Sequence, residues 1–226
     1  MKLPDNPFPV PYTVPNCVDD QPYPDKIRFI KRTLVGHLAT IFTITLSAQY
    51  VHLPYKDTQL LTVLAVILIA MTALRLTIKS GKIEQTLSVI LLLVAIPLLG
   101  QVCRDIYNSG YPILIFLIAA TLTGLYTLLA GRDFSFPGMV TICSVALIPI
   151  LLILRHQAIP TFESVAFTWI IGTIYLIYVA YNLSMILKRR IMTEVPTAIA
   201  DFYRDSLNFL TYPVRVYFHW KHYQFQ

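Results

Sequence analysis

Long apolar stretches alternate with short polar segments along most of the chain. Six of these stretches are each close to the roughly 17 to 25 residues with which a helix crosses a bilayer. Because backbone groups in lipid must be hydrogen-bonded within the protein, stretches of this length predict helices; barrel strands would be about half as long. The six predicted spans are Thr33 to Leu53, Leu60 to Ile78, Ile83 to Leu99, Tyr111 to Ala130, Pro137 to Leu154 and Val165 to Ile186.

A seventh stretch, Val195 to Phe218, is long enough to cross but carries several charged residues. It is either a span buried inside the bundle or a re-entrant segment. Its polar residues recur at helical spacing, so they share one face that must point toward the bundle or toward water. These residues are Asp201, Asp205, Asn208 and Tyr212.

The pattern therefore predicts an all-α integral membrane protein with a seven-helix bundle over residues 27–218. Seven of the 15 prolines precede Asp25, which predicts an extended, proline-rich arm over residues 1–26. Such an arm is either a flexible tail or is held by this bundle or by a partner chain. The aromatic and basic tail, residues 219–226, is typical of a membrane interface, with docking to a partner as the alternative.

Composition supports lipid as the solvent for most of the chain. Hydrophobic residues make up 56% and charged residues only 13%, against about 25% in soluble domains. The net charge of +6 does not indicate nucleic-acid binding, because the basic residues form short clusters between apolar stretches and match no binding motif.

The positions of the basic residues orient the bundle. Twelve lie in the arm and alternate loops, and three lie in the intervening loops, so the N-terminus is predicted on the cytosolic or matrix side. Arg215 and Lys221 contradict this orientation if the seventh stretch crosses, and a re-entrant segment removes the contradiction. The minority set is Lys56, Arg104 and Arg155.

The sequence carries no pattern typical of an enzyme. The five histidines and three cysteines lack metal-ligand spacing, and no phosphate-binding or nucleophile motif occurs. We therefore expect no enzymatic activity, no cofactor and no bound metal. The expected partners are the lipid bilayer, a transported cation such as calcium, and other membrane subunits contacting the arm and tail.

Ionisable and polar groups within the spans are the candidate functional residues. Asp201 is expected either to pair with Arg204 as structural support or to line an ion path. Arg75 either extends to the interface or pairs with a carboxylate. The sixth span adds a row of phenol and amide groups, whose hydroxyls need partners when buried. This row is Tyr175, Tyr178, Tyr181 and Asn182.

Two pairs of segments resemble the Bax-inhibitor (lifeguard) family. The segments AATLTGLY (119–126) and GRDFSF (131–136) resemble its fourth span and the following loop; YVAYNL (178–183) and FYRDSLNFL (202–210) resemble its sixth and seventh helices. The resemblance implies a central helix surrounded by six others. It also implies a pair of aspartates, from the sixth and seventh helices, that shares a proton and gates a calcium leak.

The chain departs from that family at one decisive position. Asp205 matches the aspartate of the seventh helix, but Asn182 stands where the sixth helix carries its partner. An amide cannot titrate, so the coupled titration of two carboxylates is lost. Arg75 falls near the arginine that latches the family's aspartates.

Two functions follow as hypotheses. One is a cation leak channel in an organelle membrane that moderates cell death, with an impaired pH gate; its ion path comprises Asp205, Asn182, Asp201, Asn208 and Arg75. The other is a non-conducting subunit of a larger membrane complex. The endoplasmic reticulum, the Golgi and the mitochondrial inner membrane are all compatible with the sequence. A small-solute transporter is less well supported, since no paired broken helices are evident.

Overall fold

The computed structural model describes residues 13–55, 57–77, 81–157, 159–206 and 212–224, and every long element in this part of the chain is an α-helix. There are also three short 3-10 turns, Val18–Asp20 before the first helix and Gly131–Asp133 and Pro160–Phe162 between later helices. The helices are α1 (Tyr23–Tyr50), α2 (Asp57–Thr77), α3 (Gly81–Asn108), α4 (Ile115–Ala130), α5 (Phe136–His156), α6 (Val165–Arg189), α7 (Val195–Arg204) and α9 (Tyr212–Gln224).

Five of these helices, α1 and α3 to α6, are long and apolar enough to cross a membrane. Helix α2 contributes a shorter apolar stretch, Thr58–Met71. The prediction of an all-α, multi-pass membrane protein is confirmed at this level. The region expected as a seventh span contains two shorter helices instead, α7 of 10 residues and α9 of 13 residues, with residues 207–211 outside the described part.

Local sequence chemistry explains where several helices begin and end. The Ser135 hydroxyl accepts a hydrogen bond from the Gly138 amide at 3.1 Å and caps the start of α5. The Ser164 hydroxyl does the same for α6, from the Phe167 amide. Helix α4 ends where Gly131 takes a φ of 53°, a conformation that glycine adopts without a steric penalty.

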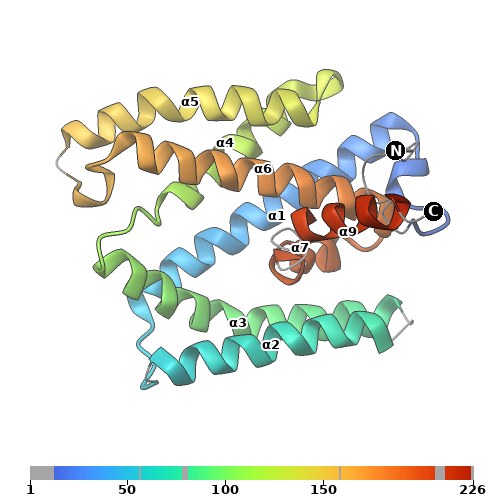
Figure 1. The fold of residues 1–226 in the computed structure, drawn as a ribbon, viewed down its shortest axis with the longest axis horizontal. Coiled ribbons are helices and arrows are strands. Elements are labelled where there is room, and N and C mark those ends of the chain that lie inside the picture. The colour runs from blue at the N-terminus through green and yellow to red at the C-terminus, as the bar shows by residue number, and fades with distance from the viewer. Residues whose placement is uncertain (1–12, 56, 78–80, 158, 207–211, 225–226) are drawn as a thin grey trace.

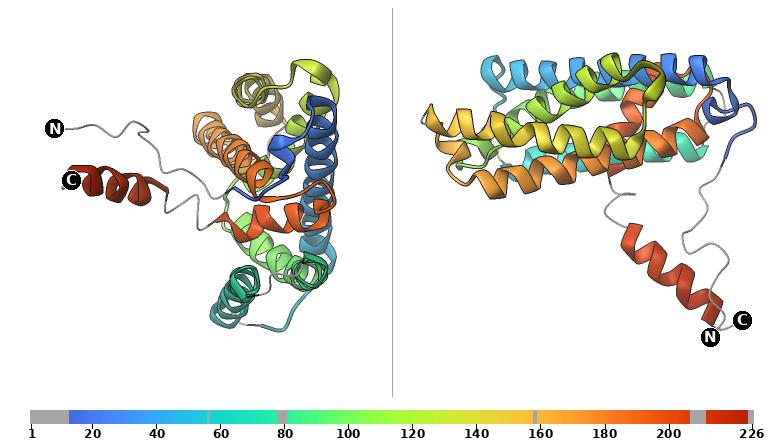
Figure 2. Two further views of the ribbon diagram at one scale, coloured as in Figure 1. Left: turned by 90° about the vertical axis from the view of Figure 1, so that its right-hand side faces the viewer. Right: turned by 90° about the horizontal axis from the view of Figure 1, so that it is seen from above.

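In the view of Figure 1, helix α1 lies between α4, α5 and α6 on one side and α2 and α3 on the other, and Figure 2 shows that it runs along one face of the bundle. The short α7 packs against α1, α3, α6 and α2. Two apolar cores result, one among α1 and α4 to α6 and one between α2 and α3. Helix α7 joins them, because Phe202 lies in the first core and Ala200 in the second.

Part of the proline-rich arm is held by the bundle itself. Residues 13–22, here called the N-terminal strap, lie across the end of α6. The amides of Val14 and Val18 donate to the carbonyls of Lys188 and Arg190 at 2.9 and 2.8 Å. Cys17 and Val18 are buried. The arm was expected to be held by the bundle or by a partner chain, and the bundle holds this segment of it. Residues 1–12 lie outside the described residues.

Helix α9 begins beside α6 and projects from the bundle (Figure 2). The rings of Tyr212 and Tyr181 lie 5.1 Å apart between centroids, so the start of α9 contacts the half of α6 nearest its C-terminal end. The tail predicted to start at residue 219 is not separate, because α9 continues through it to Gln224.

Candidate functional site

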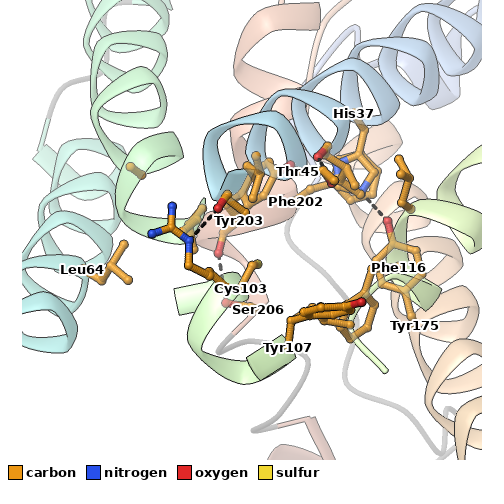
Figure 3. A pocket seen from close by; sticks show the side chains of 18 of the residues that line it. His37, Thr45, Leu64, Cys103, Tyr107, Phe116, Tyr175, Phe202, Tyr203 and Ser206 are labelled. Carbon is orange, nitrogen blue, oxygen red and sulfur yellow. Dashed lines mark hydrogen bonds between the residues drawn. The ribbon is translucent and has the colours of Figure 1, made fainter. Parts of the chain in front are cut away.

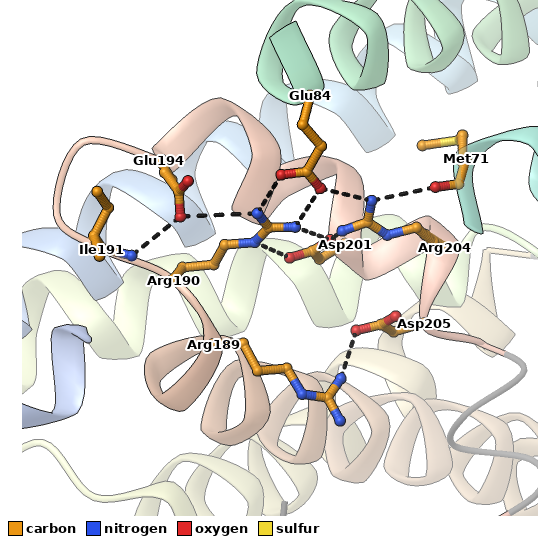
Figure 4. Close-up of polar contacts among 9 residues, drawn as sticks. All are labelled: Met71, Glu84, Arg189, Arg190, Ile191, Glu194, Asp201, Arg204 and Asp205. Atoms are coloured by element: carbon orange, nitrogen blue, oxygen red, sulfur yellow. Dashed lines mark hydrogen bonds and ion pairs between the residues drawn. The ribbon is translucent and has the colours of Figure 1, made fainter. Parts of the chain in front are cut away.

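A group of buried ion pairs joins α3, α6 and α7 (Figure 4). At its centre, the Arg190 guanidinium binds two carboxylates. Its Nη1 and Nη2 atoms donate to Glu84 at 2.8 and 3.0 Å, and its Nε and Nη2 atoms donate to Asp201 at 2.7 and 3.1 Å. We call the whole group the ion-pair cluster. Its members are Glu84, Arg189, Arg190, Glu194, Asp201, Arg204 and Asp205.

A second arginine completes the same core of the cluster. Arg204 donates to Asp201 and, at 3.2 Å, to Glu84. It also donates to the backbone carbonyl of Met71 in α2 at 3.3 Å. Asp201 and Arg204 are each 1% exposed at the side chain, so these charges are removed from water and depend on one another for stabilisation.

Asp205 belongs to a separate arm of the cluster. Its carboxylate accepts from Nη1 of Arg189 at 3.3 Å, a longer contact than the 2.7 Å between Arg190 and Asp201. The Asp205 amide donates to the Asp201 carbonyl and closes the last turn of α7. The two aspartates therefore sit at successive turns of one short segment, each facing an arginine from the end of α6.

The face of α6 that contacts α7 carries three polar side chains near the ion-pair cluster. Tyr178, Asn182 and Arg189 follow i, i+4, i+11 spacing and so lie on one side of the helix. The Tyr178 hydroxyl donates to the Phe202 carbonyl, and Arg189 reaches Asp205. Between them, Asn182 is 1% exposed. Its amide interacts with the nearby Tyr178 hydroxyl, but neither its nitrogen nor its oxygen makes a hydrogen bond of normal geometry with the described residues.

A cavity of about 790 Å³ is lined in part by α7, through Phe202 and Tyr203 (Figure 3). Along α1 it extends from His37 to Gln49, about 18 Å, and so reaches toward the end of the bundle opposite the cluster. Its walls are mostly apolar. Its polar and aromatic lining includes His37, Arg104, Tyr107, Asn108, Tyr175, Tyr178, Phe202, Tyr203 and Ser206.

The inner end of this cavity is closed by α7. Phe202 and Tyr203 line the cavity, whereas their neighbours Asp201 and Arg204 belong to the ion-pair cluster. Met71 lines the cavity as well, and its carbonyl accepts from Arg204. A single turn of α7 therefore separates the cavity from the ion-pair cluster.

Buried His37 anchors this turn of α7 to α1 and α6. Its Nε2 atom lies 2.8 Å from the Tyr175 hydroxyl, and its ring stacks on Phe202 with centroids 4.2 Å apart. No role was predicted for His37 from the sequence. Among the described residues, no group of three or more histidine, cysteine, aspartate or glutamate side chains is arranged to hold a metal ion.

The structure brings together some of the predicted site residues. The pairing of Asp201 with Arg204, expected as structural support, is present. Asp205 and Asn182 both lie at the α6–α7 contact, but Asp205 is paired with Arg189. Asn208 lies outside the described residues, as does the side chain of Arg75.

Sequence reasoning missed two central members of the cluster. Glu84 lies within a predicted apolar span, and Arg190 is one of the twelve basic residues that orient the bundle; neither was predicted as a site residue. The signal that could have found Glu84 was available: it is an acidic residue inside a predicted span, which is expected to have a charged partner.

Comparison of the chain with known protein families, curated proteins and solved structures found no match.

Proposed function

We propose that the protein is a cation leak channel of the Bax-inhibitor type, in a closed state, with calcium as the main transported ion. The observation that carries the proposal is the cavity that ends on α7, with Asp205 and the rest of the ion-pair cluster directly behind it. Cations entering the cavity would meet α7 and, once Arg189 moves away, a carboxylate able to bind them.

The two arms of the cluster suit different roles. Asp201 is bound by two arginines that also hold Glu84, so this core fixes α7 to α3 and α6. Asp205 meets Arg189 at 3.3 Å, beyond the roughly 2.7 to 2.9 Å of strong charge-assisted hydrogen bonds. Under this proposal, opening separates Asp205 from Arg189 while the core of the cluster remains closed.

The organelle and the orientation are part of the proposal. The basic residues at the C-terminal end of α6 and in the N-terminal half of α1 support a cytosolic or matrix location for the end of the bundle that carries the cluster. The cavity then extends toward the lumen of the endoplasmic reticulum or Golgi, or toward the intermembrane space.

The test is calcium flux into liposomes that contain the purified protein and an entrapped calcium dye. We expect flux with the wild-type chain, loss of flux with Asp205→Asn and increased flux with Arg189→Gln. The matched control is Asp25→Asn, which neutralises an aspartate paired with Arg28 at 3.0 Å on the exposed surface of α1. This control is expected to conduct like the wild type.

A non-conducting structural subunit is the second candidate, and Asn182 is the observation that favours it. In place of the expected second carboxylate, the chain has a buried amide that makes no hydrogen bond of normal geometry with the described residues. Absence of flux in every variant, together with stable co-purification of other membrane subunits, would support this function and overturn the channel.

A further inference from the structure

Helix α9 combines basic and aromatic residues and contains no acidic residue. Arg215 and Lys221 supply positive charge. The remaining positions are dominated by tyrosine, phenylalanine, tryptophan and valine. This composition is typical of helices that lie in a membrane interface, where basic side chains meet lipid phosphates and aromatic rings enter the headgroup region.

Three apolar side chains of α9 are largely exposed. Val214, Tyr217 and Phe218 are 54%, 61% and 60% exposed. They follow i, i+3, i+4 spacing, so they form one continuous stripe along the helix. The helix itself projects from the bundle (Figure 2).

The contact between α9 and α6 places this stripe at a suitable depth. Helix α6 has 25 residues, about 37 Å, which exceeds a hydrocarbon core of about 30 Å. Tyr181 contacts Tyr212 and lies about 12 Å from the end of α6, roughly 8 Å below the edge of that core when the helix is centred. Interfacial helices bury their apolar face about 5 to 10 Å deep.

We propose that α9 is an interfacial helix that binds an anionic membrane surface at the end of the bundle that carries the ion-pair cluster. The charge of α9 favours an anionic lipid surface as its binding partner, because a helix with two fixed positive charges and no negative charge is attracted to anionic lipids. The bundle lies in the same membrane and holds α9 beside it, so the helix binds from a high effective concentration. The proposal does not depend on ion conduction.

The experiment uses the full chain in liposomes and the fluorescence of Trp220. The chain has two tryptophans, so Trp169→Phe leaves Trp220 as the reporter. Phosphatidylcholine brominated either near the headgroup or deep in the acyl chain quenches the emission, with or without phosphatidylglycerol. Because Trp169 donates to the Ser144 carbonyl at 2.9 Å, the difference spectrum between the wild type and Trp220→Phe provides the same signal without changing the bundle.

We expect stronger quenching by the shallow bromines than by the deep ones, and a rise in quenching with phosphatidylglycerol. Arg215→Gln and Lys221→Gln should each lower the anionic-lipid preference by about fivefold. The matched control neutralises two exposed arginines elsewhere on the same end of the bundle, Arg28→Gln with Arg132→Gln, and should leave quenching unchanged.

Two results would overturn the proposal. Unquenched Trp220 emission in every lipid would leave α9 in water, available to a protein partner. Quenching that is equally strong without phosphatidylglycerol would show that apolar burial alone holds the helix and that anionic lipid is not recognised.

Discussion

Arg190 and Glu84 form a two-point contact, at 2.8 and 3.0 Å, although 106 residues separate them in the chain. The contact ties the first turn of α3 to the residue that follows α6. Through Asp201, the same arginine reaches α7. Much of the position of α7 therefore depends on one buried guanidinium.

Arg190→Gln is predicted to destabilise the protein strongly. The substitution leaves Glu84 and Asp201 buried with half of their positive charge removed, and breaking one side of a buried ion pair typically costs about 3 to 5 kcal/mol. Unfolding in detergent micelles, followed by circular dichroism, measures the loss. The control is Arg28→Gln at the exposed pair with Asp25, where a change of at most about 1 kcal/mol is expected. Equal effects of the two substitutions would contradict this account of the cluster.

Asn182→Leu is predicted to stabilise the protein. The wild-type side chain is buried and its polar atoms make no hydrogen bond of normal geometry with the described residues, a situation that costs roughly 1 to 3 kcal/mol. Leucine has a similar shape and no polar atom. Thermal unfolding measures the gain, and calcium flux measured on the same sample tests whether the amide serves conduction. A stability gain with lost flux would assign Asn182 to the ion path; a loss of stability would show that the amide has a partner after all.

Asn182→Asp is predicted to make calcium flux depend on pH. The new carboxylate would face α7 one helical turn from Tyr178, on the same side of α6 as the arginine that binds Asp205. Two neighbouring carboxylates titrate as a pair. Flux through the variant should therefore change between about pH 6 and about pH 8, where flux through the wild type stays constant. The double variant Asn182→Asp with Asp205→Asn is the control, because it removes the coupling.

The N-terminal strap can be tested at Val18, which is fully buried at the end of α6. Val18→Ala removes two methyl groups from this contact and is predicted to lower stability by about 1 to 3 kcal/mol. Val35, which is 46% exposed on α1, provides a matched Val→Ala control with a small effect. If the two variants melt together, the strap does not contribute to the stability of the bundle.

A close contact between α1 and α3 at Gly100 predicts that two helical glycines respond differently to alanine. A Cβ atom on Gly100 would lie 2.9 Å from the Ala48 amide nitrogen, where the backbone cannot move aside, so Gly100→Ala should cost about 1 to 3 kcal/mol. On Gly124 the nearest atom would be the Leu38 Cδ2 at 3.4 Å, an ordinary contact. Gly124→Ala should be neutral or stabilising by up to about 1 kcal/mol, since alanine favours a helix. Equal melting temperatures for Gly100→Ala and Gly124→Ala would show that the close contact at Gly100 does not limit its substitution.

The positions of the helices could largely be predicted because span length is set by the bilayer. The stretch predicted from Thr33 to Leu53 overlaps α1 as far as Tyr50, where the helix ends. Helix α1 begins earlier, at Tyr23, because the amphipathic turns before the apolar part continue the helix. The structure of the stretch from Val195 was harder to predict, because its charged residues are buried only with the help of oppositely charged partners on other helices.

The site was predicted in part, and its missing members have a common cause. Helical spacing places Asp201 and Asp205 within one segment, but it does not reveal which arginine faces which carboxylate. That choice depends on the packing of α3 against α7, so Glu84 becomes recognisable only in three dimensions. The cavity depends equally on packing, because its lining comes from α1, α2, α3, α4, α6 and α7.

The order in which the cluster is assembled has a consequence for biogenesis. Glu84 leaves the ribosome 106 residues before Arg190, a delay of roughly 5 to 20 s at ordinary rates of synthesis. During this interval the α2–α3 hairpin enters the membrane with a carboxylate that has neither of its arginines. Chains that stop before α7 would keep this charge only partly neutralised, so the late C-terminal segment completes the neutralisation of a helix inserted much earlier.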